Sequence, residues 1–461
     1  MDTMKLIALL LASFPVLAHS SGFRLDSAGA AAVSSVEVAA PGDPDVRRKG
    51  PADWTVMIYM NGKSNLEPFA LRDMNRIETV GSTEKVNIVV ELGRSKGLEN
   101  DTAAEGDWSG VRRYLAARDA DMEKINSPVL RDIGASDMGD WREAAKFVRW
   151  AREAYPAKRF MLILWDHGWG WLDPLKPGEN LADGAGAKSI SHDFETGNYI
   201  KTTEIGKILK EAGRVDLYAS VACFMQMGEV AYELRGLADV IVGSEEVVMF
   251  PTFNFEDFLA ALTADPGADA EKAGTLLADT YIEMYSRPEH SAMLAEYKFG
   301  AHLSAIRGPA LEGFAARAGK WAKAVLKNGD DAALRSARRD VLRFEVGDEV
   351  TDPQKLVSFY ADIHHFTSLY EAAMDGSRPA APAAAAAGRD LRDWIDSELV
   401  VRNVFLGKDR TGKDFSATRG IALNIPGLKG DLLPYHQSYG ELAFEKASGW
   451  SALVEYMENL E

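Results

Sequence analysis

Short, continuous runs of apolar residues alternate along the chain with stretches in which apolar residues recur every three or four positions. The first pattern predicts strands buried on both faces, and the second predicts helices with one buried face. Alternation of the two at this spacing favours an α/β fold, in which helices cover both faces of a largely parallel sheet. The predicted strands, several of which contain one or two polar residues, are 54–60, 86–92, 111–115, 160–165, 215–221 and 239–244.

Beyond residue 255 the pattern is mainly helical. An alanine- and proline-rich stretch, 379–388, reads as a low-complexity linker. A late apolar run, 420–425, predicts a strand that returns the chain to the first sheet, and 450–460 predicts a closing helix. The other predicted helices of this half are 255–262, 270–285, 310–326 and 355–373.

The N-terminal residues have the plan of a signal peptide. Lys5 precedes an apolar run, 6–17, and small residues follow from Ala18. The run is short for a membrane span, so we expect an exported protein, periplasmic or secreted, without a stable span after signal removal. Cleavage predicts a mature N-terminus near His19 or Ser21; a retained N-terminal anchor is the alternative. The predicted regions are a signal peptide (1–20), a flexible leader or propeptide (21–50), an α/β region that carries the candidate site residues described below (51–290) and a helical C-terminal region returning a strand to the sheet (291–461).

Composition excludes some classes of function. The chain has 52 Lys and Arg against 69 Asp and Glu, a formal charge of −17, which argues against non-specific nucleic-acid binding. An apolar fraction of 46% suffices for a packed core, and a single cysteine permits no internal disulfide.

That cysteine, Cys223, follows the strand 215–221. We expect the chain to turn at Ala222-Cys223 into a helix, which exposes the thiol beside the free N–H groups of a helix N-terminus. A thiol ionises more readily there, and the thiolate is the nucleophilic form. The alternative is that Cys223 is a small buried apolar residue, as most free cysteines are.

A second motif, Asp166-His167-Gly168, follows the apolar run 160–165. Sites in parallel α/β sheets lie at the carboxyl ends of the strands. If the strands that end before His167 and Cys223 are neighbours, a base and a thiol meet at one edge of the sheet. Taken alone, His167 reads as an ordinary histidine at the end of a strand, so the pairing of the two motifs carries the hypothesis.

The two motifs resemble those of the clostripain-like cysteine peptidases, which are relatives of the caspases and gingipains. The resemblance extends from about residue 54 to about residue 450. It implies a caspase-like α/β/α sandwich with helical C-terminal additions, and an endopeptidase that cuts proteins or peptides. The matching segments are Trp165-Asp166-His167-Gly168, Val221-Ala222-Cys223-Phe224-Met225 and Glu229-Val230-Ala231-Tyr232.

The resemblance also implies the chemistry. Cys223 attacks the peptide carbonyl, and His167 gives a proton to the leaving amine. The backbone N–H groups of Gly168 and Cys223 are the expected oxyanion donors. Asp166 receives no catalytic role. No cofactor is expected, and calcium dependence is left open on family analogy alone.

The predicted substrate pocket departs from the family pattern. Relatives that cut after Arg or Lys carry an aspartate where this chain has Val221, and in an ungapped reading Pro251 takes the place of a second acid. Without a carboxylate partner a buried arginine is unfavourable. We therefore expect a neutral or apolar residue before the scissile bond in a pocket lined by Val221, Glu245 and Pro251. The alternative is that Glu245 or Glu246 supplies the charge.

Two further hypotheses concern processing and metals. Lys176 and Lys188 lie in the segment that is cut during maturation in the family, although an uncut surface loop is an equal alternative here. His192 and Asp193 could form a metal site together with Asp166, but they lack ligand spacing, so no metal site is predicted. An exported binding or scaffold protein of the same fold, with little or no catalysis, is the rival to the peptidase.

Overall fold

The computed structural model of the 461-residue chain describes residues 51–98, 100–172, 190–344, 360–409, 412–427 and 436–460. The predicted signal peptide and leader, together with Lys176 and Lys188, lie outside these ranges.

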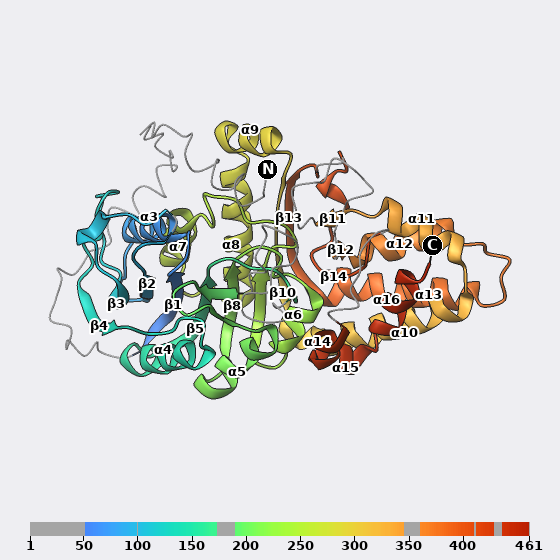
Figure 1. The fold of residues 1–461 in the computed structure, drawn as a ribbon, viewed down its shortest axis with the longest axis horizontal. Coiled ribbons are helices and arrows are strands. Elements are labelled where there is room, and N and C mark those ends of the chain that lie inside the picture. Colours follow the sequence, from blue (N-terminus) through green and yellow to red (C-terminus); the bar gives the residue numbers. More distant parts are fainter. Residues whose placement is uncertain are drawn as a thin grey trace.

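A nine-stranded sheet runs through the centre of the molecule in the order β13-β10-β9-β8-β5-β1-β2-β3-β4 (Figure 1). Its middle strands, from β9 to β2, are parallel, and the strands at both edges are antiparallel to their neighbours. This mixed sheet with a parallel centre confirms the predicted fold class. The strands are β1 (Ala52–Gly62), β2 (Val86–Arg94), β3 (Gly110–Leu115), β4 (Val129–Gly134), β5 (Ala157–Trp165), β8 (Val215–Val221), β9 (Ala238–Gly243), β10 (Gly300–Arg307) and β13 (Val400–Gly407).

Helices cover both faces of this sheet (Figure 1). In β1, Val56 and Ile58 join one buried apolar cluster, and the alternate residues Met57 and Tyr59 join another. Side chains of a strand alternate between faces, so a strand buried on both faces is a continuous apolar run. The first face packs on α3 (Glu67–Glu78), α7 (Phe255–Ala264) and α8 (Ala270–Tyr285); the second packs on α4 (Trp141–Ala154), α5 (Thr202–Ala212), α6 (Gly228–Glu233) and α10 (Leu311–Asn328).

The alanine-rich stretch predicted as a linker is a helix, α13 (Ala381–Trp394). Alanine is the best helix former, and Pro382 stands in the first turn, where no intrahelical donor is needed. The linker prediction was therefore wrong, because an alanine-rich sequence favours a helix even where its complexity is low.

The late strand forms as β14 (Ala422–Asn424), but it does not return to the first sheet. It pairs with β12 (Tyr360–Asp362) in a small sheet that also holds β11 (Arg343–Phe344). The C-terminal region instead contributes β10 and β13 to the main sheet, and the sequence analysis predicted neither strand. The remaining elements are the β6 (Ile190–Asp193) and β7 (Asn198–Ile200) pair, α9 (Pro288–Tyr297), α11 (Asp331–Asp340), α12 (Ile363–Ala373), α14 (His436–Glu441), α15 (Ala443–Ser448) and α16 (Ser451–Glu458).

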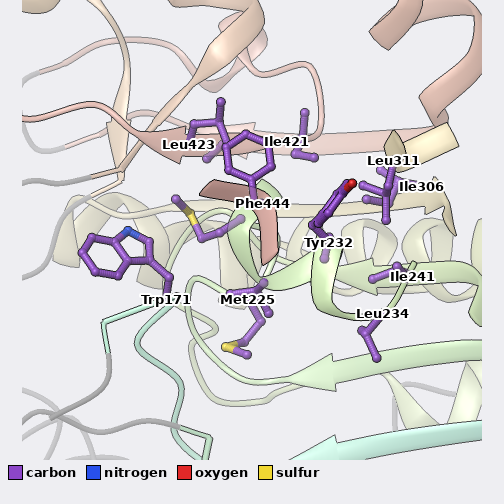
Figure 2. Close-up of a cluster of buried hydrophobic side chains, with 14 of the residues drawn as sticks. Trp171, Met225, Tyr232, Leu234, Ile241, Ile306, Leu311, Ile421, Leu423 and Phe444 are labelled. Carbon is purple, nitrogen blue, oxygen red and sulfur yellow. The ribbon is translucent and has the colours of Figure 1, made fainter. Parts of the chain in front are cut away.

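One buried cluster joins the main sheet to the C-terminal region (Figure 2). It brings Met225 and Tyr232, which follow β8, together with Leu423 of β14 and Phe444 of α15. The segment after Cys223 is thus covered by β14 and α15, which come about two hundred positions later in the chain. None of the helices in the described ranges is long and apolar enough to cross a membrane.

Candidate active site

The site lies where the strand order reverses direction. From β1 the chain continues in one direction along the sheet through β2, β3 and β4. It then returns to β5, on the other side of β1, and continues in the opposite direction through β8. Such a point opens a crevice at the carboxyl ends of the strands. Trp165 of β5 pairs with Met60 of β1 and with Val221 of β8. His167 and Cys223 each come two residues after one of these paired positions, so the prediction that their strands are neighbours is confirmed.

Gly168 lies directly against the cysteine turn. A Cβ atom at Gly168 would stand 2.5 Å from the carbonyl oxygen of Cys223 and 3.0 Å from its amide nitrogen. It would also stand 2.8 Å from the Cβ atom of Ala222. Only glycine permits this approach. The two backbones predicted to hold the oxyanion are therefore adjacent.

The cysteine turn is sharper than the sequence suggested. Phe224 has a φ of 60°, a left-handed conformation that costs a non-glycine residue about 1–2 kcal/mol. The Phe224 ring is held between Trp169, at a centroid distance of 6.2 Å, and Tyr360, at 5.5 Å. Strain of this kind persists only where surrounding packing enforces it.

The sequence predicted that the turn at Cys223 leads directly into a helix, and this prediction was wrong. α6 begins at Gly228, and Met227 forms an isolated bridge with Ala422 of β14. Cys223 is therefore not at a helix N-terminus. Instead the backbone N–H of Val248 donates to its Sγ at 3.4 Å. A donor directed at sulfur stabilises negative charge there, which is the effect that the helix had been expected to supply.

The segment after β9 forms one wall of the site. The Phe224 N–H donates to the carbonyl of Glu246 at 3.2 Å, and the Gln226 N–H donates to the carbonyl of Ser244 at 2.9 Å. Burial, and secondarily the charge of Cys223, raise the pKa of Tyr281 on α8 well above its ordinary value. The half-buried thiol thus faces this wall and lies near Tyr281, in the C-terminal part of α8.

His167 is held by a residue that the sequence analysis missed. Its Nε2 lies 2.7 Å from Oδ1 of Asn65, in the loop between β1 and α3. Its ring stacks on Phe194 at a centroid distance of 6.2 Å and an interplanar angle of 8°. Both His167 and Asn65 are buried. The signal in the sequence that points to Asn65 is its position just after β1, which ends at the same edge of the sheet as β5 and β8.

Asp166 has a structural environment. Asn61 Nδ2 donates to one of its carboxylate oxygens at 3.3 Å, and Ser64 Oγ donates to the other at 3.4 Å. Asn61 lies at the end of β1, and Ser64 lies in the same loop as Asn65. Asp166 therefore ties the end of β1 and this loop to the end of β5.

The hypothetical metal residues serve other contacts. Asp193 accepts from Lys63 Nζ at 2.7 Å, and His192 packs edge-on against Phe194. Among the residues that the structure describes, no three metal-ligating side chains come together. That the protein needs no cofactor stays a prediction, and so does any dependence on calcium.

Of the predicted pocket residues, Val221 lies in an apolar setting. It belongs to the cluster that includes Trp165 and Met249, and its side chain is 2% exposed. The carbonyl oxygen of Pro251 accepts from the hydroxyl of Tyr285 at 2.8 Å. These contacts bring Val221 and the loop 249–251 to the same face of the sheet, over α8.

A buried acid does lie next to this cluster, but its oxygens are occupied. Asp73 of α3 accepts from Trp165 Nε1 at 2.8 Å and from Thr252 Oγ1 at 2.5 Å. Its other oxygen pairs with Arg76 at 3.0 Å. Burial raises the pKa of Asp73, and these three partners oppose that rise. The carboxylate is already compensated within the protein.

The Glu245 carboxyl contacts groups outside the apolar cluster that holds Val221. It accepts from the Gly420 N–H at 3.1 Å and contacts His302 Nε2 at 3.1 Å. Burial raises the pKa of Glu245 well above its ordinary value and lowers that of His302 to about 4. The contact is therefore a hydrogen bond of a neutral imidazole. The predicted pocket role of Glu245 gains no support from these partners.

Comparison with known families gives one match over most of the chain. The model of the clostripain family matches residues 58–457. Clostripain of Hathewaya histolytica is 27% identical over 234 residues, which are 48% of this chain and 44% of that protein. The chain thus spans less than half the length of the curated relative that it matches.

Solved structures give the same fold. A secreted C11 cysteine protease from Bacteroides thetaiotaomicron, in complex with an irreversible peptide inhibitor, superposes with a TM-score of 0.58 at 18% identity, over 87% of this chain and 99% of that one. An inactive zymogen C11 protease from Parabacteroides distasonis gives 0.58 at 16% identity, with the same coverage. At these identities the likeness shows the fold.

Proposed function

Because this chain belongs to the clostripain family of cysteine peptidases, we propose that it is an endopeptidase in which Cys223 and His167 form the catalytic dyad. The observation that carries the proposal is the junction of β5 and β8. Trp165 and Val221 are paired at the ends of these strands, and one motif follows each of them. Gly168 lies against the backbone of Cys223.

The proposed reaction is acyl transfer to sulfur. The Cys223 thiolate adds to the peptide carbonyl, forming a C–S bond while the carbonyl electrons move to oxygen. The Gly168 and Cys223 N–H groups bind this oxyanion, and each such donor is typically worth ~3 kcal/mol of the barrier. Collapse breaks the C–N bond as His167 protonates the amine. Water then attacks the thioester, gives its proton to His167, and releases the acid and the thiolate.

The proposed substrate has a neutral or apolar residue before the scissile bond. Val221 stands among apolar side chains, and the nearby Asp73 carboxylate is paired with Arg76. An arginine in this surrounding loses its hydration without a bidentate partner, whereas an apolar side chain gains about 25 cal/mol per Å² of buried area. The inhibitor bound by the B. thetaiotaomicron relative is a peptide, which agrees with a peptide substrate here.

Cleavage of a peptide library tests activity and specificity together. The wild type is expected to cut after neutral or apolar residues, and Val221→Asp is expected to add cleavage after Arg and Lys because it restores a carboxylate. Val129→Asp, which places the same charge on an exposed strand, is the control and keeps the wild-type profile. A wild type that cuts best after Arg or Lys would contradict the proposed preference for neutral or apolar residues. This result decides the question even if Val221→Asp fails to fold. A wild type that cuts no peptide would favour the scaffold alternative.

We further propose that the protein is exported. The charged residue, apolar run and small residues at the N-terminus support this proposal, and one structural relative is a secreted protease. When the gene is expressed with its N-terminal segment, mass spectrometry of the exported protein should give an N-terminus near His19 or Ser21. Recovery of a soluble cytoplasmic protein that begins at Met1 would contradict this prediction.

A further inference from the structure

His167 follows β5, which lies between β1 and β8. The loop between β1 and α3 therefore approaches His167 from one side, and the cysteine turn after β8 lies on the other. β1 is the neighbour of β5, so the residues after Gly62 run past Asp166 and His167. Two side-chain-to-backbone hydrogen bonds shape this loop: the Lys63 N–H donates to Asn61 Oδ1 at 3.0 Å, and the Leu66 N–H donates to Ser64 Oγ at 3.2 Å. Between them they fix where the Asn65 side chain is presented.

Asn65 makes a short hydrogen bond to the imidazole. Its Oδ1 lies 2.7 Å from Nε2 of His167, and the Asn65 and His167 side chains are 3% and 9% exposed. An amide oxygen can only accept, so Nε2 must carry the hydrogen. The neutral ring is then the Nε2–H tautomer, and its basic nitrogen is Nδ1.

We infer that Asn65 is a positioning residue for His167, and that His167 exchanges protons with the thiol and the substrate through Nδ1. The inference rests on the proposed dyad and deepens it. Asn65 Oδ1 holds the ring in one orientation together with the stacked Phe194, and it accepts from the imidazolium as well as from the neutral ring. A hydrogen bond to the charged form stabilises that form.

The charged groups around this contact already have partners. Asp166 accepts from Asn61, at the end of β1, and from Ser64, on the same loop as Asn65. Asp193, beside Phe194, is paired with Lys63 at 2.7 Å, and Lys63 also pairs with Glu195 at 2.8 Å. A neutral amide is therefore the acceptor that meets Nε2, and replacing it by a carboxylate changes the charge at the ring without changing its size.

This difference gives a test with opposite signs. The alkaline limb of the kcat/KM profile marks loss of the imidazolium proton that the leaving amine needs. Asn65→Ala removes the acceptor, so the limb should move to lower pH by about one unit, and kcat/KM at the optimum should fall about ten- to a hundredfold. Asn65→Asp keeps an acceptor and adds a negative charge, so the limb should move to higher pH by about one unit.

The measurement uses a peptide from the library profile, with Asn126→Ala, an exposed asparagine in a distant loop, as the control with the wild-type profile. If the alkaline limb of the kcat/KM profile does not move, or moves in the same direction in both Asn65 variants, Asn65 is not a positioning residue for His167. If Asn65→Ala fails to fold, the direction of the Asn65→Asp limb decides alone.

Failure of the dyad itself is recognised separately. Cys223 is the only cysteine of the chain, so alkylation by iodoacetamide reports on this thiol without a substrate. The rate at neutral pH should fall about tenfold or more in His167→Ala, because a thiolate beside an imidazolium is more abundant than a free thiolate. Equal rates in wild type and His167→Ala would reject the dyad. A His167-dependent rate together with unmoved limbs in the Asn65 variants would reject the role of Asn65 alone.

Discussion

Cys223→Ala is expected to lower kcat/KM for peptide hydrolysis by a factor on the order of 10⁴ or more. The methyl group cannot form the thioester, and water alone must then attack the carbonyl. His167→Ala should lose a comparable factor, because the thiolate loses its imidazolium partner and the amine loses its proton donor. Residues that act as one unit are not additive, so the double variant should be no slower than the slower single variant.

The losses must be separated from unfolding. Cys223 is half-buried and its Sγ contacts the backbone of Val248, so its replacement should change the free energy of unfolding by no more than about 1 kcal/mol. A peptidyl electrophile should label the wild type rapidly, His167→Ala slowly and Cys223→Ala not at all. Hydrolysis by folded Cys223→Ala at a rate close to that of the wild type would refute the mechanism.

Gly168→Ala is expected to lower kcat/KM by about a hundredfold. The added methyl group would stand 2.5 Å from the carbonyl oxygen of Cys223, so the two backbones must separate. The thiol, the proposed oxyanion donors and His167 all sit on these two segments, and a displacement of about 1 Å between catalytic groups suffices for a loss of this size. The overpacking should also cost about 1–3 kcal/mol of unfolding free energy.

The matched control is Gly376→Ala, since a Cβ atom there meets nothing within 4 Å and the backbone is not left-handed. This variant should keep the wild-type kcat/KM. Steady-state kinetics at a temperature well below the unfolding transition separates lost activity from lost fold. A folded Gly168→Ala with the wild-type kcat/KM would mean that the close approach of Gly168 to Cys223 is not needed for catalysis.

The C-terminal region has a direct part in shaping the proposed site. The Ala422 N–H donates to the carbonyl of Gln226 at 3.2 Å, and Met227 bridges the same residue. Tyr360 of β12 packs on the ring of Phe224, and its hydroxyl donates to the carbonyl of Trp169. The strained turn after Cys223 and the loop after His167 are thus both held by strands of the small sheet.

The amino-acid sequence alone determined the type of most elements and the identity of the two motifs. Runs such as 160–165 are apolar at every position, which suits only a strand covered on both faces, and the structure places them in the parallel centre of the sheet. His167 could be found because it follows such a run, and Cys223 because it follows a second predicted strand, 215–221. Their adjacency followed from one rule, that parallel strands end at a common edge.

What the sequence could not determine were the partners of segments far apart in the chain. A local pattern records that 420–425 is buried and extended, but β14 pairs with β12 because the packing of the whole C-terminal region selects that neighbour. Asn65 reaches His167 across 102 positions, and Val248 reaches Cys223 across 25. Each of these contacts depends on the path of a loop, which is fixed by hydrogen bonds and packing with other segments. The tertiary structure alone therefore decided which groups surround the thiol and the imidazole.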